Sequence, residues 1–340
     1  MFRRVLTFVI LLFISFSFLI FTQNKKNTIG MALFRFDDDY TQYLKSYIEK
    51  NIGNKASLTI VNSHNSQVTQ NDQIEIFLNK KVNLIAINLV NESYAQTIIN
   101  KVSVRNIPII FFNREPDSEA LNSYNNVWYI GGSSENAGTA QGRVIADSWK
   151  SHANWDKNED GKIQCIIIKG RTNSFESENR TQYMKDYLKN NNIKLDILAE
   201  VYAFENRKTA SIEMDKLMAK YSQKIEYIIS NDDNMALGAL DSIKKLGFNN
   251  NSRMLNYIPI VGIGGIPEYL KEIKNYSVFA TVMQNPSTQA EVLSKVSLNI
   301  INNKSPLDGT TLSFDNNKYI FVPYIPITMF NLDRAIEIYK

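Results

Sequence analysis

The chain has 340 residues, and its 44% hydrophobic content is enough for one large domain or two ordinary ones. The net charge of +4 comes from 38 Lys and Arg residues interspersed with 34 Asp and Glu residues, which is not the clustered basic surface of a nucleic-acid-binding protein. A single cysteine, Cys165, excludes an intrachain disulfide framework, and the two histidines have no neighbouring cysteine or histidine with which to bind zinc.

The first 26 residues have the layout of an export signal. Arg3 and Arg4 are followed by an uncharged apolar run over residues 5–21, and the small residues at 15–17 have the spacing of a cleavage site. The run is also long enough to remain as a membrane anchor. Residues 1–26 are therefore a signal peptide or an N-terminal membrane anchor. In both cases we expect the body of the protein in the periplasm or otherwise outside the cytoplasm.

From residue 27 onward, short apolar runs alternate with longer segments that have apolar residues at helical spacing. Runs such as "TIGMALF" and "VNLIAINLV" predict strands that are buried on both faces, and segments such as "DYTQYLKSYIEKN" predict amphipathic helices. A second cycle of the same kind begins at "IQCIIIKG". The apolar surroundings of Cys165 in this run indicate a buried, inert thiol. We expect an α/β protein with two doubly wound, Rossmann-like lobes.

Polar side chains follow many of the predicted strands, at the point where each strand ends. They are Asp37–Asp39, Asn113, Arg171–Glu176, Asn231–Asp233 and Gln284–Asn285. In open parallel sheets, ligands bind outside the carboxyl ends of the strands, so two lobes whose strand ends face each other would enclose a polar cleft. The alternative for any single one of these residues is that it caps the next helix.

The stretch "NWDKNEDGKIQ" has the spacing of a calcium-binding loop over residues 156–164. Its oxygen donors, in order, are Asp156, Asn158, Asp160, the carbonyl group of Lys162, and Gln164. Gly161 takes the position of the sharp turn, and hard oxygen donors favour Ca²⁺. The twelfth position, usually a bidentate glutamate, is Ile167, at which a strand replaces the usual helix. Another part of the fold must therefore supply a carboxylate; the alternative is a surface turn rich in Asp and Asn.

The loop and its flanks resemble the periplasmic galactose/glucose-binding proteins, which are substrate-binding components of sugar ABC transporters. Segments that match in order, from about residue 28 to residue 326, include "DDDY", "IPIIFFNREP", "ENRTQYMKDYL", "KIEYIISNDDNMALGAL" and "IPIVGIGGIPE". The resemblance implies that Glu226, in "KIEYII", completes the calcium site and that the ion is structural. It also implies a type I periplasmic-binding-protein fold, with a hinge and a ligand cleft between the lobes.

We expect each lobe to be assembled from two stretches of the chain. The N-terminal lobe comprises residues 27–132 and about 284–320. The C-terminal lobe comprises residues 133–283 and about 321–335, and it carries the calcium loop.

For the sugar site, the resemblance implies a set of retained side chains. Asp38 and Asn113 match residues that take sugar hydroxyl groups. Arg180 matches an arginine that reaches the anomeric end of the sugar, and Tyr40 stands where an aromatic ring packs on one face. These are suitable groups, because carboxylates and amides pair with two hydroxyl groups each, arginine presents a fixed fork of donors, and a ring covers sugar C–H groups.

Other positions of the same site differ from the family pattern. The family's histidine, aspartate and two asparagines correspond here to Ser174, Glu176, Asp232 and Gln284. Its aspartate after "IPIVGI" is Gly264, and its tryptophan aligns with Glu205, beside Phe204. A buried hydroxyl group that loses its partner costs about 1–3 kcal/mol, so the ligand is a glucose- or galactose-like sugar or a different polar molecule.

The function that we expect is capture of a sugar outside the cytoplasm and its delivery to an ABC permease, by a monomer with no nucleic-acid partner. The alternative is a membrane-tethered or chemoreceptor-coupled sensory domain without transport. We do not expect an enzyme, because the chain has no G-x-S-x-G motif, P-loop or Cys/His pair, although carboxylates such as Asp38 and Asp232 suit glycoside hydrolysis in general. A repressor is disfavoured because no helix-turn-helix precedes residue 27.

Overall fold

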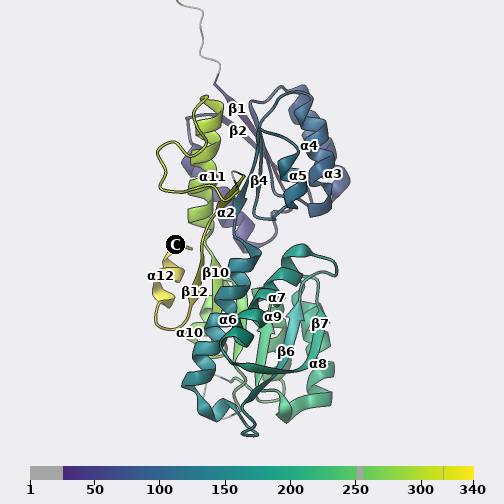
Figure 1. Ribbon diagram of the computed structural model, residues 1–340, viewed down its shortest axis with the longest axis vertical. Coiled ribbons are helices and arrows are strands. Elements are labelled where there is room, and N and C mark those ends of the chain that lie inside the picture. The colour runs from purple at the N-terminus through teal and green to yellow at the C-terminus, as the bar shows by residue number, and fades with distance from the viewer. Residues whose placement is uncertain (1–25, 251–255, 317) are drawn as a thin grey trace, which may run out of the picture.

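The computed structural model describes residues 26–250, 256–316 and 318–340, so the predicted export signal or anchor lies outside the described residues apart from Lys26. The described chain forms two α/β lobes that are stacked along the longest axis of the molecule (Figure 1). Within these ranges, no helix is both long enough and apolar enough to cross a lipid bilayer.

The N-terminal lobe is built on a parallel sheet of six strands in the described chain, in the order β11-β5-β4-β3-β1-β2. The strands are β1 (Thr28–Leu33), β2 (Ser57–Asn62), β3 (Leu84–Ile87), β4 (Ile109–Phe112), β5 (Val127–Gly131) and β11 (Tyr319–Phe321). The helices are α2 (Asp39–Ile52), α3 (Gln67–Asn79), α4 (Ala95–Ser103), α5 (Ser118–Asn122) and α11 (Pro286–Ile301). Helices α3, α4 and α5 share a core with one face of the sheet, and α2 and α11 share a core with the other. Burial on both faces explains why the inner strands β3, β4 and β5 are almost entirely apolar, whereas the edge strand β2 is half polar and partly exposed.

The C-terminal lobe repeats this plan, with the strand order β12-β10-β9-β8-β6-β7. Its strands are β6 (Lys162–Lys169), β7 (Lys194–Tyr202), β8 (Tyr227–Ser230), β9 (Ile260–Gly264), β10 (Ala280–Gln284) and β12 (Tyr324–Ile327). Its helices are α6 (Ser134–Ser151), α7 (Phe175–Asn190), α8 (Arg207–Tyr221), α9 (Asp233–Lys244), α10 (Pro267–Lys274) and α12 (Leu332–Glu337). Short 3-10 turns lie at Ala153–Trp155 and Ser222–Lys224 in this lobe and at Glu92–Tyr94 in the N-terminal lobe. Helices α6 and α7 cover one face, and α8, α9, α10 and α12 cover the other. The prediction of two doubly wound lobes is confirmed.

One strand departs from the expected parallel arrangement. β12 pairs antiparallel with β10. The reason is its short connection to β11, because only residues 322 and 323 separate the two strands. β11 runs parallel to β5 and therefore ends at the side of the N-terminal lobe that faces the cleft. The chain then enters the C-terminal lobe at the cleft, so β12 runs away from the cleft, opposite in direction to β10.

The described chain passes between the lobes after β5, after β10 and between β11 and β12. Because each passage is short, the carboxyl ends of both sheets lie beside the gap between the lobes (Figure 1).

The apolar strand β6 buries Cys165 completely, and this burial raises the pKa of its thiol to about 12. The thiol is therefore inert, as expected.

Candidate ligand-binding cleft

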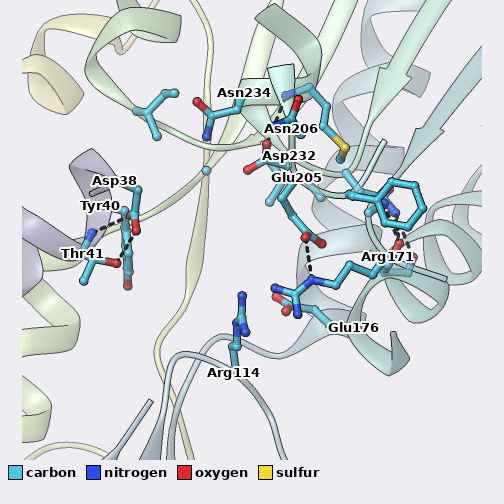
Figure 2. A pocket seen from close by; sticks show the side chains of 18 of the residues that line it. Asp38, Tyr40, Thr41, Arg114, Arg171, Glu176, Glu205, Asn206, Asp232 and Asn234 are labelled. Atoms are coloured by element: carbon cyan, nitrogen blue, oxygen red, sulfur yellow. Dashed lines mark hydrogen bonds and ion pairs between the residues drawn. The ribbon is translucent and has the colours of Figure 1, made fainter. Parts of the chain in front are cut away.

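A polar cleft of about 530 Å³ lies between the two lobes, and residues of both lobes line it (Figure 2). Every side chain of the predicted sugar site lines this cleft: Asp38, Tyr40, Asn113, Ser174, Glu176, Arg180, Asp232 and Gln284. Gly264, Phe204 and Glu205 line it as well. The structure therefore brings together residues that are up to 246 positions apart in the chain (284 − 38).

Asp38 has two roles, since it caps helix α2 and also faces the cleft. Its Oδ1 accepts a hydrogen bond from the backbone N–H of Thr41 at 2.8 Å, and its Oδ2 accepts from the Thr41 hydroxyl at 2.8 Å. Nε of Arg35 donates to Oδ2 at 3.1 Å. The capping alternative is thus correct for this residue, and it does not exclude a binding role, because each carboxylate oxygen has more than one lone pair.

A chain of neutral hydrogen bonds fixes the other polar groups of the N-terminal side. The hydroxyl group of half-buried Tyr40 donates to Oε1 of Gln289, and burial raises the pKa of this hydroxyl well above its ordinary value. Nε2 of Gln284 donates to the same oxygen at 3.0 Å and to Oδ1 of Asn113 at 3.0 Å. Asn113 has a positive φ of 66°, which asparagine tolerates better than most residues. These bonds hold the Asn113 amide in one orientation.

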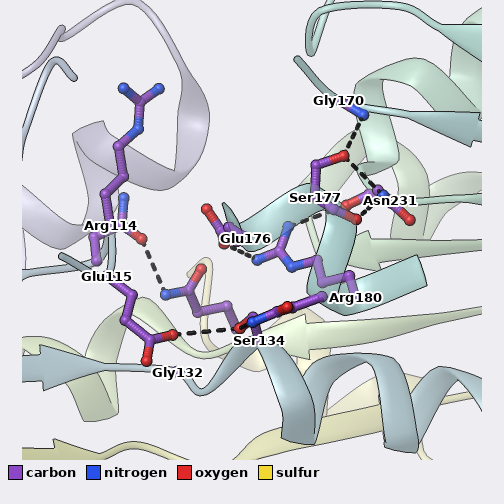
Figure 3. Close-up of polar contacts among 12 residues, drawn as sticks. Arg114, Glu115, Gly132, Ser134, Gly170, Glu176, Ser177, Arg180 and Asn231 are labelled. Atoms are coloured by element: carbon purple, nitrogen blue, oxygen red, sulfur yellow. Dashed lines mark hydrogen bonds and ion pairs between the residues drawn. The ribbon is translucent and has the colours of Figure 1, made fainter. Parts of the chain in front are cut away.

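On the C-terminal side, Arg180 and Glu176 form an ion pair one turn apart on α7 (Figure 3). Nη1 of Arg180 also donates to the carbonyl oxygen of Asn231 at 3.1 Å, and Nη2 donates to the hydroxyl oxygen of Tyr324 at 2.8 Å. Burial alone lowers the pKa of Arg180, but Glu176 and Tyr324 raise it above its ordinary value. Nε of Arg180 is buried and has no acceptor among the described residues.

Ser174 and Asp232 cap the helices that begin at the same side of the cleft. The Ser174 hydroxyl accepts from the N–H of Ser177 at 3.3 Å, and Oδ1 of Asp232 accepts from the N–H of Met235 at 3.1 Å. Within the described ranges, Asp232 has no ion-pair partner. Burial, together with the charge of Glu205, raises the pKa of Asp232 to about 6. Asp232 is therefore an acceptor that a donor on a ligand would stabilise.

Several residues that the sequence did not single out as site residues also line the cleft. Arg114 follows Asn113 directly, and Arg171 lies in the strand-end segment after β6. Nε of Arg171 donates to Oε2 of Glu205 at 2.9 Å. Phe204, next to Glu205, is 53% exposed. The predicted sugar-stacking position therefore holds the exposed ring of Phe204 and, beside it, Glu205 in an ion pair with Arg171. The pairing with Arg171 is evident only from the folded structure.

Buried Asp233 holds the loop that contains Gly264, and sequence reasoning did not identify this contact. Its Oδ2 accepts from the N–H groups of Gly265 and Ile266 at 2.5 and 3.1 Å, and its Oδ1 accepts from the Thr281 hydroxyl at 2.7 Å. Gly264 has a φ of +144°, and a Cβ atom there would lie 3.2 Å from Oδ2. This backbone conformation suits glycine, so the wall of the cleft carries no side chain at the end of β9.

The residues of the predicted calcium loop lie on a tight turn before β6. The carboxylates accept hydrogen bonds from the turn itself, for example Asp156 Oδ2 from the N–H of Gly161 at 2.9 Å and Asp160 Oδ1 from the N–H of Lys162 at 2.9 Å. Oδ1 of Asn158 accepts from the N–H of Asp160 at 3.2 Å. As expected, a strand and not a helix follows the loop.

Glu226 reaches this loop from the segment before β8. Its Oε1 accepts from the N–H of Lys157 at 2.6 Å, and its Oε2 accepts from the N–H of Gln164 at 3.1 Å. Burial and the charge of Asp156 raise the pKa of Glu226. Oε1 of Gln164 is buried and has no partner among the described residues. An orphaned oxygen and two repelling carboxylates fit a bound cation.

The set of oxygen donors is mixed. No group of three or more His, Cys, Asp or Glu side chains in the described chain is arranged to hold a metal ion. An ion at this loop would therefore depend on the Asn158 and Gln164 amide oxygens and on the Lys162 carbonyl as well as on carboxylates, which is the kind of ligand set that Ca²⁺ takes.

The fold and the cleft define a two-lobed solute-binding protein. The family model of the periplasmic binding protein domain matches residues 29–305, and the chain belongs to this family. The D-galactose/methyl-galactoside binding periplasmic protein of Haemophilus influenzae is 33% identical over 317 residues, which is 92% of this chain and 92% of that protein. The ribose import binding protein of Bacillus subtilis is 23% identical over 286 residues, which is 83% of this chain and 84% of that protein.

A solved structure gives the same result for the fold. The ABC transporter solute-binding protein of Bacillus halodurans with bound myo-inositol matches with a TM-score of 0.77 and 21% identity, over 94% of this chain and 100% of that chain. The predicted fold class and family are thus confirmed, and the role that belongs to this family is that of the extracytoplasmic solute-binding component of an ABC transporter.

Proposed function

We propose that this protein captures a sugar in the cleft between its lobes and delivers it to an ABC permease. The observation that carries the proposal is the convergence of eight polar or aromatic side chains from both lobes on a single cleft, in a chain that is 33% identical to a galactose-binding relative. Closure of the lobes by a hinge motion presents the loaded form to the permease. The sensory alternative has no observation of its own in its favour.

The proposed contacts follow from the chemistry of each group. Asp38 accepts from sugar hydroxyl groups, Asn113 accepts from and donates to them, and the guanidinium group of Arg180 donates to a ring or anomeric oxygen. Tyr40 covers one face of the ring with its aromatic surface, and Phe204 covers the other when the lobes close. No group in this arrangement is assigned a catalytic role.

The identity of the sugar depends on the C-terminal wall of the cleft. Glu176 is tied to Arg180, Asp232 supplies a carboxylate at the end of β8, and Gly264 supplies no side chain at the end of β9. We infer that the ligand is a hexose or a related polar molecule whose hydroxyl groups bind the carboxylates of Glu176 and Asp232 at these positions. This pattern does not require galactose or glucose.

We also propose that the loop at residues 156–164 binds a structural Ca²⁺ ion. Its ligands would be Asp156, Asn158, Asp160, the Lys162 carbonyl, Gln164 and Glu226. The ion would supply positive charge to the carboxylates and fix the turn that precedes β6. Chelation is expected to lower the melting temperature by several degrees, since a ligand at about 100 times its Kd adds about 2.7 kcal/mol of stability. Asp156→Asn should abolish this response, and an unchanged melting temperature in chelator would contradict the proposal.

Two further parts of the proposal concern location and assembly. Residues 1–26 act as a signal peptide or as a membrane anchor, and mass spectrometry of the exported protein distinguishes these alternatives. The protein works as a monomer, and a chemoreceptor is a second partner for its closed form. Light scattering of the purified protein tests the monomeric state.

The test of the proposed function is a thermal-shift screen of the chain from residue 27 onward against glucose, galactose and a panel of other sugars and polyols. Isothermal titration then measures the affinity of each positive. We expect at least one sugar to raise the melting temperature by several degrees. Galactose or glucose binding would mean that the altered C-terminal wall is tolerated. A panel with no binding sugar would overturn the proposal.

A further inference from the structure

Arg114 is held in place by its own lobe at the edge of the cleft. Its Nη1 donates to the carbonyl oxygens of Leu89 and Val90 at 3.1 and 2.7 Å. Its guanidinium carbon lies 4.0 Å from the centroid of the Phe34 ring, which adds a cation–π contact. The side chain is thus oriented before any ligand arrives, so little conformational entropy is lost if it makes another contact.

The charge of Arg114 is only weakly balanced within that lobe. The nearest carboxylate among the described residues is Glu92, whose Oε1 lies 4.0 Å from Nε of Arg114, at the limit of an ion pair. The side chain is only 11% exposed. Burial and the charge of Arg171 lower the pKa of Arg114, but a guanidinium group remains charged at all ordinary pH values. A shielded cation of this kind gains from a closer anion.

Two ion pairs of the C-terminal lobe face Arg114 across the cleft. They are Arg180 with Glu176 and Arg171 with Glu205 (Figures 2 and 3). Both glutamates act on Arg114 through space, Glu176 more strongly than Glu205. In the described chain, however, every ion pair made by a cleft-lining residue joins two residues of the same lobe. Glu176 therefore has no cationic partner among the described residues of the other lobe, while Arg171 repels Arg114 across the cleft more strongly than either glutamate attracts it.

We infer that Arg114 is a clamp between the lobes: when the cleft closes on its ligand, Arg114 pairs with Glu176 and stabilises the closed form. The inference rests on the proposed closure of the lobes around a sugar. Glu176 would then share its two oxygens between Arg180 and Arg114, one on each side. Because the pair forms only on closure, it raises the affinity mainly by slowing ligand release, without any need for Arg114 to contact the sugar.

A double-mutant cycle tests the clamp. Isothermal titration would compare wild-type protein, Arg114→Gln, Glu176→Gln and the double variant, with galactose or whichever sugar of the panel gives the largest thermal shift. We expect Arg114→Gln to weaken binding about tenfold in the wild-type background and less than twofold in the Glu176→Gln background. Increasing salt should weaken binding to the wild type more than binding to Arg114→Gln.

Arg35→Gln is the matched control, because Arg35 lines the same lobe of the cleft but already pairs with Asp38 at 3.1 Å. Its effect should be the same with and without Glu176→Gln. Additive effects of Arg114→Gln and Glu176→Gln would overturn the clamp. They would mean that Arg114 acts on binding independently of Glu176, for example by contacting the ligand directly. A wild-type protein that binds no sugar of the panel would instead overturn the proposed function itself, and the clamp with it.

Discussion

The two walls of the cleft are built differently. On the N-terminal wall, Tyr40, Gln289 and Asn113 are joined in a neutral chain of hydrogen bonds through Gln284 at the end of β10, and Asp38 is tied to the start of α2. On the C-terminal wall the polar groups are mostly charged and paired with one another, and Asp232 has a pKa of about 6. The first wall is a fixed template, whereas the second depends on charge.

The differences from the family pattern follow the same division. Among the residues that the resemblance marks as retained, Asp38, Asn113 and Tyr40 lie on the N-terminal wall, and Arg180 lies on the C-terminal wall. The altered positions Ser174, Glu176, Asp232 and Gly264 all lie on the C-terminal wall, and the altered Gln284 lies where the chain crosses between the lobes. We therefore predict that the choice among sugars depends more on the altered positions of the C-terminal wall than on the N-terminal wall.

Substitution of Asp38 should have the largest effect, because it removes a group that has two roles. Asp38→Ala is expected to weaken sugar binding about 100-fold and to cost about 1 kcal/mol of stability through loss of the cap on α2. Asp38→Asn keeps the cap, and should therefore retain the stability while it still loses tenfold or more in affinity. Titration calorimetry and thermal melting separate the two effects. An Asp232→Ala variant with a greater loss of affinity than Asp38→Ala would break the proposed difference between the walls.

Asp232, on the C-terminal wall, should contribute to the pH dependence of stability. The folded pKa of Asp232, about 6, is raised above the ordinary value by burial, so its contribution to stability is complete below about pH 4 and is lost as the pH rises through 6. Two pKa units correspond to about 3 kcal/mol, and the partial exposure of Asp232 reduces this to about 1–2 kcal/mol.

Asp232→Asn, which keeps the cap on α9, should therefore be more stable than the wild type at pH 8 by about 1–2 kcal/mol and equal to it near pH 4. Urea denaturation of the ligand-free proteins at several pH values measures this difference. A difference that does not change with pH would mean that Asp232 titrates normally in the folded protein.

The smallest effect is expected for Tyr40→Phe. This change removes the hydroxyl group that donates to Gln289 and leaves the aromatic surface in place. Loss of one neutral hydrogen bond of about 1 kcal/mol should weaken sugar binding about fivefold, equally at pH 5.5 and pH 8. Tyr124→Phe, which removes a hydroxyl group that donates to Ile107 outside the cleft, is the matched control and should bind like the wild type. A strongly pH-dependent loss for Tyr40→Phe would be inconsistent with a neutral network.

Sequence patterns predicted the fold because each apolar strand and each amphipathic helix is specified locally. They also predicted that Asp38, Asn113 and Asp232 lie at the cleft, since each comes shortly after a strand of a parallel sheet. The direction of β12 was not predictable from its residues, because it depends on where the preceding strand leaves the other lobe.

The charged contacts of the cleft were less accessible to sequence reasoning. Arg171 and Glu205 lie in different loops, and nothing in either segment indicates that they pair. Asp233 resembles a second helix cap in the sequence, yet its side chain turns inward to hold the loop after β9. Such contacts depend on the distances between strand ends in the folded protein, and the local periodicity of the sequence gives no information on those distances.

The crossing of the chain between the lobes also affects the order in which the protein can fold. The N-terminal lobe is incomplete until α11 covers one face of its sheet and β11 pairs with β5, and both come from the last part of the chain. A nascent chain that ends before residue 286 therefore leaves the apolar face of α2 without its partner helix. The first lobe of the nascent chain therefore remains incomplete until synthesis is nearly finished.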